Sequence, residues 1–209
     1  VRDEGNAAGT GTAPHPVLKK YYDSESERWP FVSALFDNAA EHYDWVCGMG
    51  SLGSDRFYRR WVLVKSGLRA GMKLLDVATG TGLVARAATR ILREPGAVIG
   101  LDPSGGMLRE AQKTLAIPLV QGTVEELPFA SNHFDFVSMG FALRHVADLG
   151  RLFSEMLRVL RPGGIACVLE ITRPETRMRT WLLKAYMRGL IPALSWFVAR
   201  NADTPKLMR

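Results

Sequence analysis

Short apolar runs alternate with helix-like segments through the middle of this 209-residue chain. The apolar runs predict strands at 73–78, 97–101, 118–121, 134–140 and 165–171. Segments with helical spacing lie between them, at about 82–92, 104–115 and 149–160. Because strands and helices alternate, the pattern predicts an α/β fold with a parallel sheet that is covered by helices on both faces.

The chain on either side of this core has a different composition. Residues 1–16 are rich in Gly, Ala and Thr and are expected to form a flexible tail. Residues 17–70 are rich in aromatic side chains, with helices expected at 33–45 and 55–68, and could form a helical lid over a pocket. We expect residues 71–172 to form the core and residues 173–209 a basic and apolar helical segment of the same single domain.

The positive charge of the chain is concentrated near its end. The sequence has 27 Lys and Arg against 21 Asp and Glu, a net charge of +6. Residues 1–172 are neutral, so the whole excess lies in 173–209. A general nucleic-acid-binding domain is therefore not expected. Lys184, Arg188 and Pro192 interrupt the apolar stretch there, so it predicts no membrane span.

Cysteine usage excludes two further classes of protein. Cys47 and Cys167 are the two cysteines of the chain, too few for a disulfide framework. No CxxC pair or Cys/His cluster suggests zinc, and no metal is expected. These features fit a protein of the reducing cytoplasm.

The strongest chemical signal follows the first expected strand. Gly80, Gly82 and Ala85 match G-x-G-x-x-G/A at a helix start, and Asp102 ends the next strand twenty residues after Gly82. Such glycines let a ligand approach the backbone, and Asp102 could accept both hydroxyls of a ribose. Asp76 precedes the glycines and would repel the phosphates of a dinucleotide. It would suit the ammonium group of S-adenosylmethionine; the alternative is that it only caps the loop.

Several motifs in order resemble the class I S-adenosylmethionine-dependent methyltransferases, and more narrowly the UbiE/Coq5 (MenG) branch that methylates quinone precursors. They are DVATGTG, LDPSGGML, VQGTVEELPF, FDFVSMGFALRHV and LRVLRPGG, and the resemblance runs from about Phe36 to Asp203. It implies a Rossmann-like fold with strand order 3-2-1-4-5. The antiparallel strand pair with which that family ends is expected to be absent from this chain.

The resemblance also assigns roles by position. It implies that the cofactor is bound by Asp76, Ala78, Gly80, Thr81, Gly82, Asp102, Met107, Thr123, Val124 and Gly140. Tyr43 and Phe141 are expected at the substrate, although Tyr43 could equally be a core residue. The family often has Asn at 123, where Thr keeps a hydroxyl but loses the amide, and a close relative has Ser at 140, where Gly removes the side-chain contact.

The segment FALRHV suggests the catalytic residues. Arg144 keeps an arginine that the family links to substrate activation, and His145 replaces an asparagine. A ring carbon attacks a methyl group more readily once a neighbouring hydroxyl is deprotonated. His145 titrates in the working range and could be the base, while Arg144 could stabilise the phenolate. The alternatives are a structural ion pair for Arg144 and a non-catalytic role for His145.

The sequence thus predicts a methyltransferase that acts on a small aromatic or quinol-like molecule. A specialised-metabolite O-, N- or C-methyltransferase and a non-catalytic S-adenosylmethionine-binding protein are the alternatives, with an NAD(P)-dependent oxidoreductase the least favoured. The basic, apolar residues 180–200 are interpreted as a core-covering helix, or alternatively as a surface that associates peripherally with a membrane. A homodimer is left open.

Overall fold

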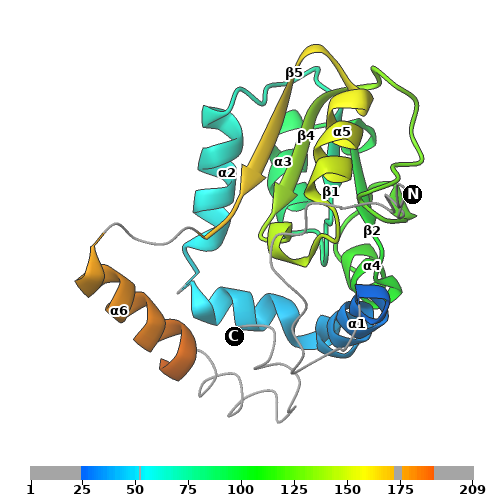
Figure 1. The fold of residues 1–209 in the computed structure, drawn as a ribbon. Helices are drawn as coiled ribbons and strands as arrows, with labels where there is room; N and C mark the ends of the chain where they lie inside the picture. The colour runs from blue at the N-terminus through cyan, green and yellow to red at the C-terminus, as the bar shows by residue number, and fades with distance from the viewer. Residues whose placement is uncertain (1–24, 52, 172–175, 191–209) are drawn as a thin grey trace, which may run out of the picture.

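The computed structural model describes residues 25–51, 53–171 and 176–190 (Figure 1). Five strands form a single parallel sheet in the order β3-β2-β1-β4-β5. The strands are β1 (Leu74–Val77), β2 (Val98–Asp102), β3 (Leu119–Gln121), β4 (Phe134–Gly140) and β5 (Leu160–Leu169). This confirms the predicted fold class and strand order.

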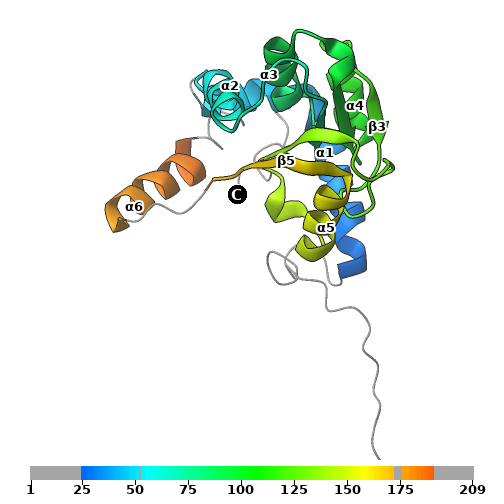
Figure 2. The same ribbon diagram turned by 90° about the horizontal axis from the view of Figure 1, so that it is seen from above.

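Helices cover both faces of the sheet (Figure 2). The α-helices are α1 (Glu25–Gly50), α2 (Asp55–Lys65), α3 (Leu83–Leu92), α4 (Gly105–Gln112), α5 (Leu149–Val159) and α6 (Arg177–Ala185). Side chains alternate between the two faces of a strand. Leu74 therefore packs with α2 and α3, while its neighbour Leu75 packs with α5 on the other face, and both are fully buried.

Two elements differ most from their predicted bounds. The first helix, α1, has 26 residues rather than the 33–45 expected. The last strand, β5, begins at Leu160 and continues through Pro162-Gly163-Gly164, which the sequence marked as a turn. Its register against β4 shifts between Phe134 and Phe136, and Gly163 has a φ of +78°. This irregularity lets β5 absorb the turn residues without ending.

Two predictions fall mostly outside the described residues. The expected tail at 1–16 lies outside them entirely. Of the segment 173–209, residues 176–190 are described and form α6 and a π-helical turn at Tyr186–Leu190. None of the helices in the described part of the chain is both long and apolar enough to cross a membrane.

Candidate functional site

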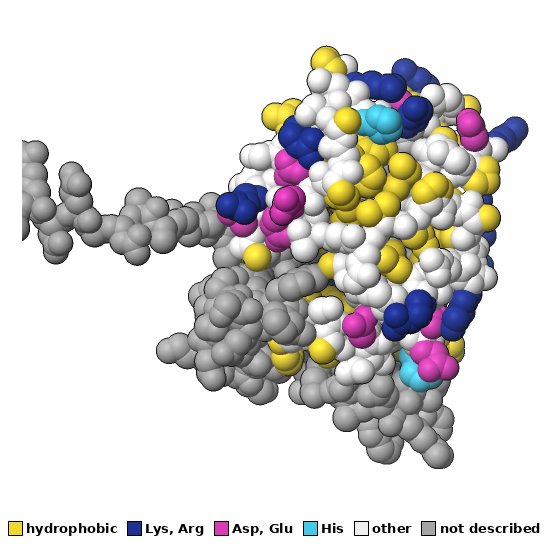
Figure 3. Space-filling view, turned by 90° about the vertical axis from the view of Figure 1, so that its right-hand side faces the viewer, with side chains coloured by type: hydrophobic (Ala, Val, Ile, Leu, Met, Phe, Trp, Pro, Cys, Tyr) yellow, Lys and Arg dark blue, Asp and Glu magenta, His cyan; other side chains and the backbone are white. Residues whose placement is uncertain are grey.

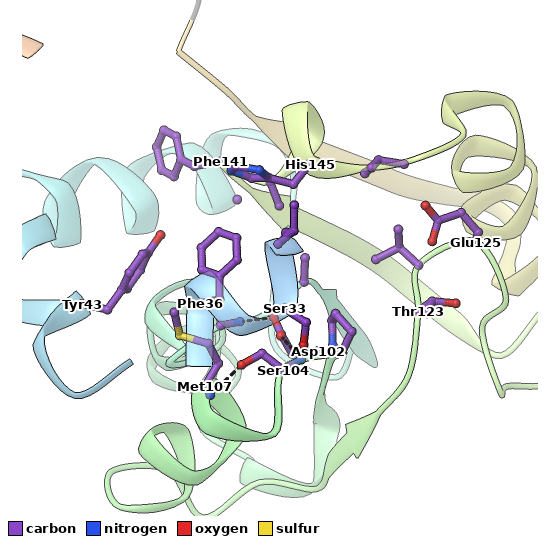
Figure 4. A pocket seen from close by; sticks show the side chains of 18 residues that line it. Ser33, Phe36, Tyr43, Asp102, Ser104, Met107, Thr123, Glu125, Phe141 and His145 are labelled. Carbon is purple, nitrogen blue, oxygen red and sulfur yellow. Dashed lines mark hydrogen bonds between the residues drawn. The ribbon is translucent and has the colours of Figure 1, made fainter. Parts of the chain in front are cut away.

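A pocket opens at the carboxyl ends of β1, β2 and β4, where parallel sheets usually bind ligands. In Figure 4, Tyr43 and Thr123 lie on opposite sides of it, and Phe141 and His145 lie across from Asp102 and Met107. The side chains come from α1, from the loops after β1, β2, β3 and β4, and from α4. The lining residues are Val32, Ser33, Phe36, Tyr43, Ala78, Gly80, Asp102, Pro103, Ser104, Met107, Thr123, Val124, Glu125, Gly140, Phe141, Ala142, His145 and Val146.

The glycine loop after β1 forms one wall of this pocket. Ala78, Gly80 and Gly82 all have left-handed backbone, with φ of +52°, +57° and +84°. A Cβ at Gly80 would meet no atom within 4 Å, so the backbone there faces open space. A Cβ at Gly82 would run into the Leu115 side chain, so that glycine is needed for packing against the segment after α4. Of the two glycines, Gly80 borders the pocket and Gly82 does not.

Asp102 ends β2 and is 7% exposed. Its Oδ2 accepts the Gly80 N–H at 2.8 Å, and its Oδ1 accepts the Ser104 N–H at 2.9 Å. Burial raises the pKa of this carboxyl to about 6. An ionised carboxylate has about four acceptor sites, so two remain for hydroxyl donors at the pocket surface. The carboxylate therefore fits the adjacent hydroxyls of a ribose.

The part of the pocket beside Asp102 fits an aromatic base. Met107 is buried at the start of α4, and Val124 is buried in the loop after β3, beside Thr123. These side chains form an apolar slot next to Asp102 that can hold an adenine ring. The residues present therefore suit the nucleoside part of S-adenosylmethionine.

Asp76 lies beneath the glycine loop rather than at the pocket surface, and is 1% exposed. Thr79 and Ser138 each donate a hydroxyl to it at 2.6 Å, and Ala85 donates its backbone N–H at 3.1 Å. Burial raises its pKa to about 6, and these donors partly oppose the rise. In this structure Asp76 ties β1, β4 and the start of α3 together. A direct contact with the cofactor stays a prediction.

Two carboxylates fasten α1 across the carboxyl edge of the sheet. Asp37 accepts the Ser104 hydroxyl at 2.5 Å and the Gly106 N–H at 2.8 Å, both at the start of α4. Two turns later, Asp44 accepts the Thr81 hydroxyl and pairs with Arg86 at 3.4 Å. Thr81 thus holds α1 rather than lining the pocket. The two contacts place Ser33, Phe36 and Tyr43 of α1 in the pocket wall.

Aromatic side chains surround the end of the pocket away from Asp102. The rings of Phe36 and His145 meet edge to face, with centroids 5.1 Å apart. Tyr43 lies near Phe36, and burial raises its pKa well above the usual value, so its hydroxyl stays protonated. Phe141 has a left-handed backbone, with a φ of +59°, directly after β4. This end suits a flat, apolar molecule.

Arg59 packs against the aromatic end of the pocket. It is buried in α2, pairs with Asp55 at 3.4 Å and places its guanidinium carbon 4.8 Å from the Phe141 ring centroid. A Cβ at Gly140 would approach Arg59 to 3.4 Å and Val84 to 2.7 Å. The missing side chain at Gly140 therefore allows α2 and α3 to pack closely against the pocket.

The two predicted catalytic residues lie in different surroundings. His145 lines the pocket, whereas Arg144 does not. The Arg144 side chain is 47% exposed and its Nη1 lies 3.4 Å from Glu170, which also accepts the Leu143 N–H. This ion pair joins the 3₁₀ turn Leu143–His145 to the end of β5. The pair corresponds to the structural alternative considered for Arg144.

Several residues of the site were not predicted. The residues that position or line the pocket without having been predicted are Phe36, Arg59, Asp37 and Asp44. The last three are charged, and charged residues in amphipathic helices are typical of solvated surface. The seven-residue spacing of Asp37 and Asp44 was the available signal, because it puts both on one face of a helix. Among the described residues, no group of His, Cys, Asp and Glu could hold a metal ion.

Comparison with known proteins identifies the family that the chain resembles. A model described as the ubiE/COQ5 methyltransferase family matches residues 21–208. A demethylmenaquinone methyltransferase of Symbiobacterium thermophilum is 36% identical over 191 residues, covering 88% of this chain and 76% of that protein. A ubiquinone/menaquinone biosynthesis C-methyltransferase of Hahella chejuensis is 34% identical over 186 residues, covering 86% and 75%.

Solved structures agree with the fold. An S-adenosylmethionine-dependent methyltransferase from Aquifex aeolicus matches with a TM-score of 0.52 and 22% identity, over 62% of this chain and 77% of that one. A Methanococcus maripaludis protein assigned to the same enzyme class matches with a TM-score of 0.59 and 20% identity, over 82% and 79%. At these identities the likeness concerns the fold alone.

Proposed function

The chain belongs to the ubiE/COQ5 methyltransferase family and is an S-adenosylmethionine-dependent methyltransferase, and on that premise we propose that it methylates a ring carbon of a quinol or a related aromatic hydroxyl compound. The observation that carries the proposal is a single pocket with two chemically different ends. Asp102 and Gly80 border the polar end, and Phe36, Tyr43, Phe141 and His145 surround the apolar end. The relatives named above act in quinone biosynthesis by their names, which supports a quinol.

The polar end would hold the cofactor. Asp102 would accept the ribose hydroxyls, Met107 and Val124 would flank the adenine, and Gly80 would leave room for the methionyl part beside the glycine loop. S-adenosylmethionine would supply a methyl group on a positively charged sulfur, and the methyl–sulfur bond would break on transfer to leave S-adenosylhomocysteine. Alignment of this methyl group with the acceptor carbon would provide much of the rate.

The apolar end would hold and activate the acceptor. Phe36 and Phe141 would pack against the ring and exclude water from it. The imidazole of His145 would take the proton of the ring hydroxyl, which raises the electron density on the neighbouring carbon. The protonated Tyr43 hydroxyl would donate a hydrogen bond to the resulting oxyanion. Arg144 would fix the turn that carries His145 through its contact with Glu170, and its positive charge partly opposes the rise in pKa that burial causes at the Tyr43 hydroxyl.

The test separates binding from chemistry. Asp102→Asn should weaken S-adenosylmethionine binding in calorimetry by at least tenfold, since charge-assisted hydrogen bonds contribute about 1.5–3 kcal/mol each. His145→Ala should keep that affinity and lower kcat on a demethylmenaquinol analogue. An unchanged kcat would remove His145 from the mechanism, and unchanged binding in Asp102→Asn would contradict the placement of the cofactor.

One observation favours a second candidate, a specialised-metabolite methyltransferase. His145 stands at the substrate end where the resembled family has Asn, and Thr123 and Gly140 also depart from it. A panel of small phenols assayed beside the demethylmenaquinol analogue, with mass spectrometry of the methylated products, would distinguish the two. Preference for the quinol would support the first proposal.

A further inference from the structure

The outer face of α2 is apolar although it faces solvent. Phe57 is 73% exposed and Trp61 55%, and Tyr58 and Val64 are each about half exposed. Phe57, Trp61 and Val64 recur at i, i+4 and i+7 and so share one side of the helix. The buried side carries Arg59 and Leu63 instead. The helix thus presents to solvent the aromatic stripe that a core helix would bury.

Basic side chains flank this stripe on both sides. The Lys65 ammonium lies 4.6 Å from the Trp61 ring centroid, and the Arg56 guanidinium lies 5.8 Å from the Phe57 ring centroid. Arg60 follows Arg56 by one turn, and Arg90 of α3 joins both at a shallow hollow beside Phe57. Long basic side chains next to exposed Trp and Phe are typical of helices that lie at a membrane surface.

Part of the positive charge beside α2 has no acidic partner among the described residues. A second hollow lies between α2, α3 and the end of α1, and its charged lining residues are five arginines and two aspartates: Arg56, Arg59, Arg60, Arg86, Arg90, Asp44 and Asp55. Asp55 pairs with Arg59 and Asp44 pairs with Arg86. Within the described part of the chain, no ion pair involves Arg56, Arg60 or Arg90. Three positive charges therefore remain beside the aromatic stripe.

The other side of the molecule provides a contrast. Figure 3 shows the side that lies to the right in Figure 1, where hydrophobic side chains gather in the middle and charges of both signs lie around them. On α5, Phe153 is 47% exposed and Leu157 74%. The charged side chains on α5 are paired, Glu155 with Arg158 and Arg151 with Asp148, which caps the start of the helix. These pairs leave no excess of positive charge on α5, so we expect no attraction to an anionic partner there.

We propose that the outer face of α2 docks on an anionic phospholipid bilayer, with Phe57, Trp61 and Val64 in the headgroup region. Arg56, Arg60 and Arg90 bind lipid phosphates beside them. Arginine suits this role because its planar guanidinium donates two parallel hydrogen bonds to a phosphate. The role of this surface rests on the proposed function: it would bring the enzyme to the membrane that holds a quinol with a lipid tail.

The experiment measures binding of the full chain to phosphatidylcholine vesicles with and without 30% phosphatidylglycerol, by sedimentation and by tryptophan fluorescence. Binding should require the anionic lipid. Phe57→Ser with Trp61→Ser should weaken it about tenfold or more, because two large apolar side chains leave the interface. Phe153→Ser with Leu157→Ser is the matched control on α5 and should leave binding unchanged.

The charge is tested separately. Changing Arg56, Arg60 and Arg90 together to Gln should weaken binding to the anionic vesicles about a hundredfold, at about fivefold for each arginine. Arg109→Gln and Arg151→Gln, on other exposed surfaces, should have much smaller effects. S-adenosylmethionine binding by calorimetry would show that each variant is folded.

Three results would overturn the proposal. They are equal binding to both kinds of vesicle, equal loss in the α2 and α5 variants, and a change of the α2 variants in oligomeric state by analytical ultracentrifugation without a change in vesicle binding. The last would assign the surface to a second copy of the chain. The assay contains no quinol, so its failure would leave the proposed methylation untouched, and failure of methylation would leave the vesicle result intact.

Discussion

Asp37 holds α1 over the pocket, and its removal should loosen that helix without unfolding the core. Asp37→Ala deletes the acceptor for the Ser104 hydroxyl at 2.5 Å and for the Gly106 N–H at 2.8 Å. Hydrogen bonds to a charged group contribute about 1.5–3 kcal/mol each when buried. Asp37 is exposed, so we discount the pair to about 2 kcal/mol in total. That is roughly a thirtyfold change in the ratio of attached to detached α1.

Hydrogen exchange read by mass spectrometry measures this directly. Amides of α1 should lose about thirtyfold in protection, while those of β1 and β4 keep theirs, because local opening leaves the sheet intact. S-adenosylhomocysteine should restore part of the loss, since a ligand in the pocket contacts both α1 and the core. Added ligand therefore also tests whether α1 belongs to the site.

Asp135→Ala is the matched control. Asp135 accepts the Lys73 N–H and pairs with Arg161, each at 2.8 Å, and neither partner belongs to α1 or α4. Its removal should leave exchange in α1 unchanged. Unchanged protection of α1 in Asp37→Ala, or an equal loss in β1 and β4, would refute the reasoning, because α1 would then be held mainly by other contacts.

Two further predictions concern the core beneath the pocket. Burial raises the pKa values of Asp76 and Asp102 above the unfolded value of 3.8, to about 6, so the folded state binds more protons between about pH 4 and 6. Their contribution to the free energy of unfolding should therefore decline as pH rises through that range, and Asp76→Asn should flatten the decline in urea titrations at several pH values. Gly140→Ala should destabilise the fold by about 1–3 kcal/mol, because its Cβ would lie 2.7 Å from Val84. Combining it with Val84→Ala should cost less than the sum of the two single changes, and strict additivity in the urea cycle would disprove the clash.

The sheet could be predicted from the sequence because each strand contains a short apolar run. Strands buried on both faces need such runs, and β1 and β4 are buried along almost their whole length. The start of β5 could not be predicted. Gly163 has a positive φ and permits a shift in register, so Pro162-Gly163-Gly164 stays within the strand instead of ending it. The Pro and Gly residues indicate that the strand is interrupted, but the local sequence does not show that pairing with β4 continues through them.

The part of the candidate site that could be predicted is the part whose residues lie at the ends of adjacent strands. Gly80 and Asp102 follow adjacent parallel strands, so their meeting at one edge follows from the fold. Arg144 and His145 were predicted together from the FALRHV motif, but in a 3₁₀ turn successive side chains point about 120° apart. His145 therefore enters the pocket while Arg144 turns to Glu170. The support from Arg59 depends on how α2 packs, which local sequence does not specify.

The left-handed backbones of Ala78 and Phe141 have a consequence for heat resistance. Both residues border the pocket, one directly after β1 and one directly after β4. A left-handed conformation costs a non-glycine residue about 1–2 kcal/mol, and it persists only while the surrounding packing enforces it. As the protein warms, relaxation of these two positions would distort the pocket before the sheet separates. Catalytic activity would then fade at temperatures where the molecule is still folded.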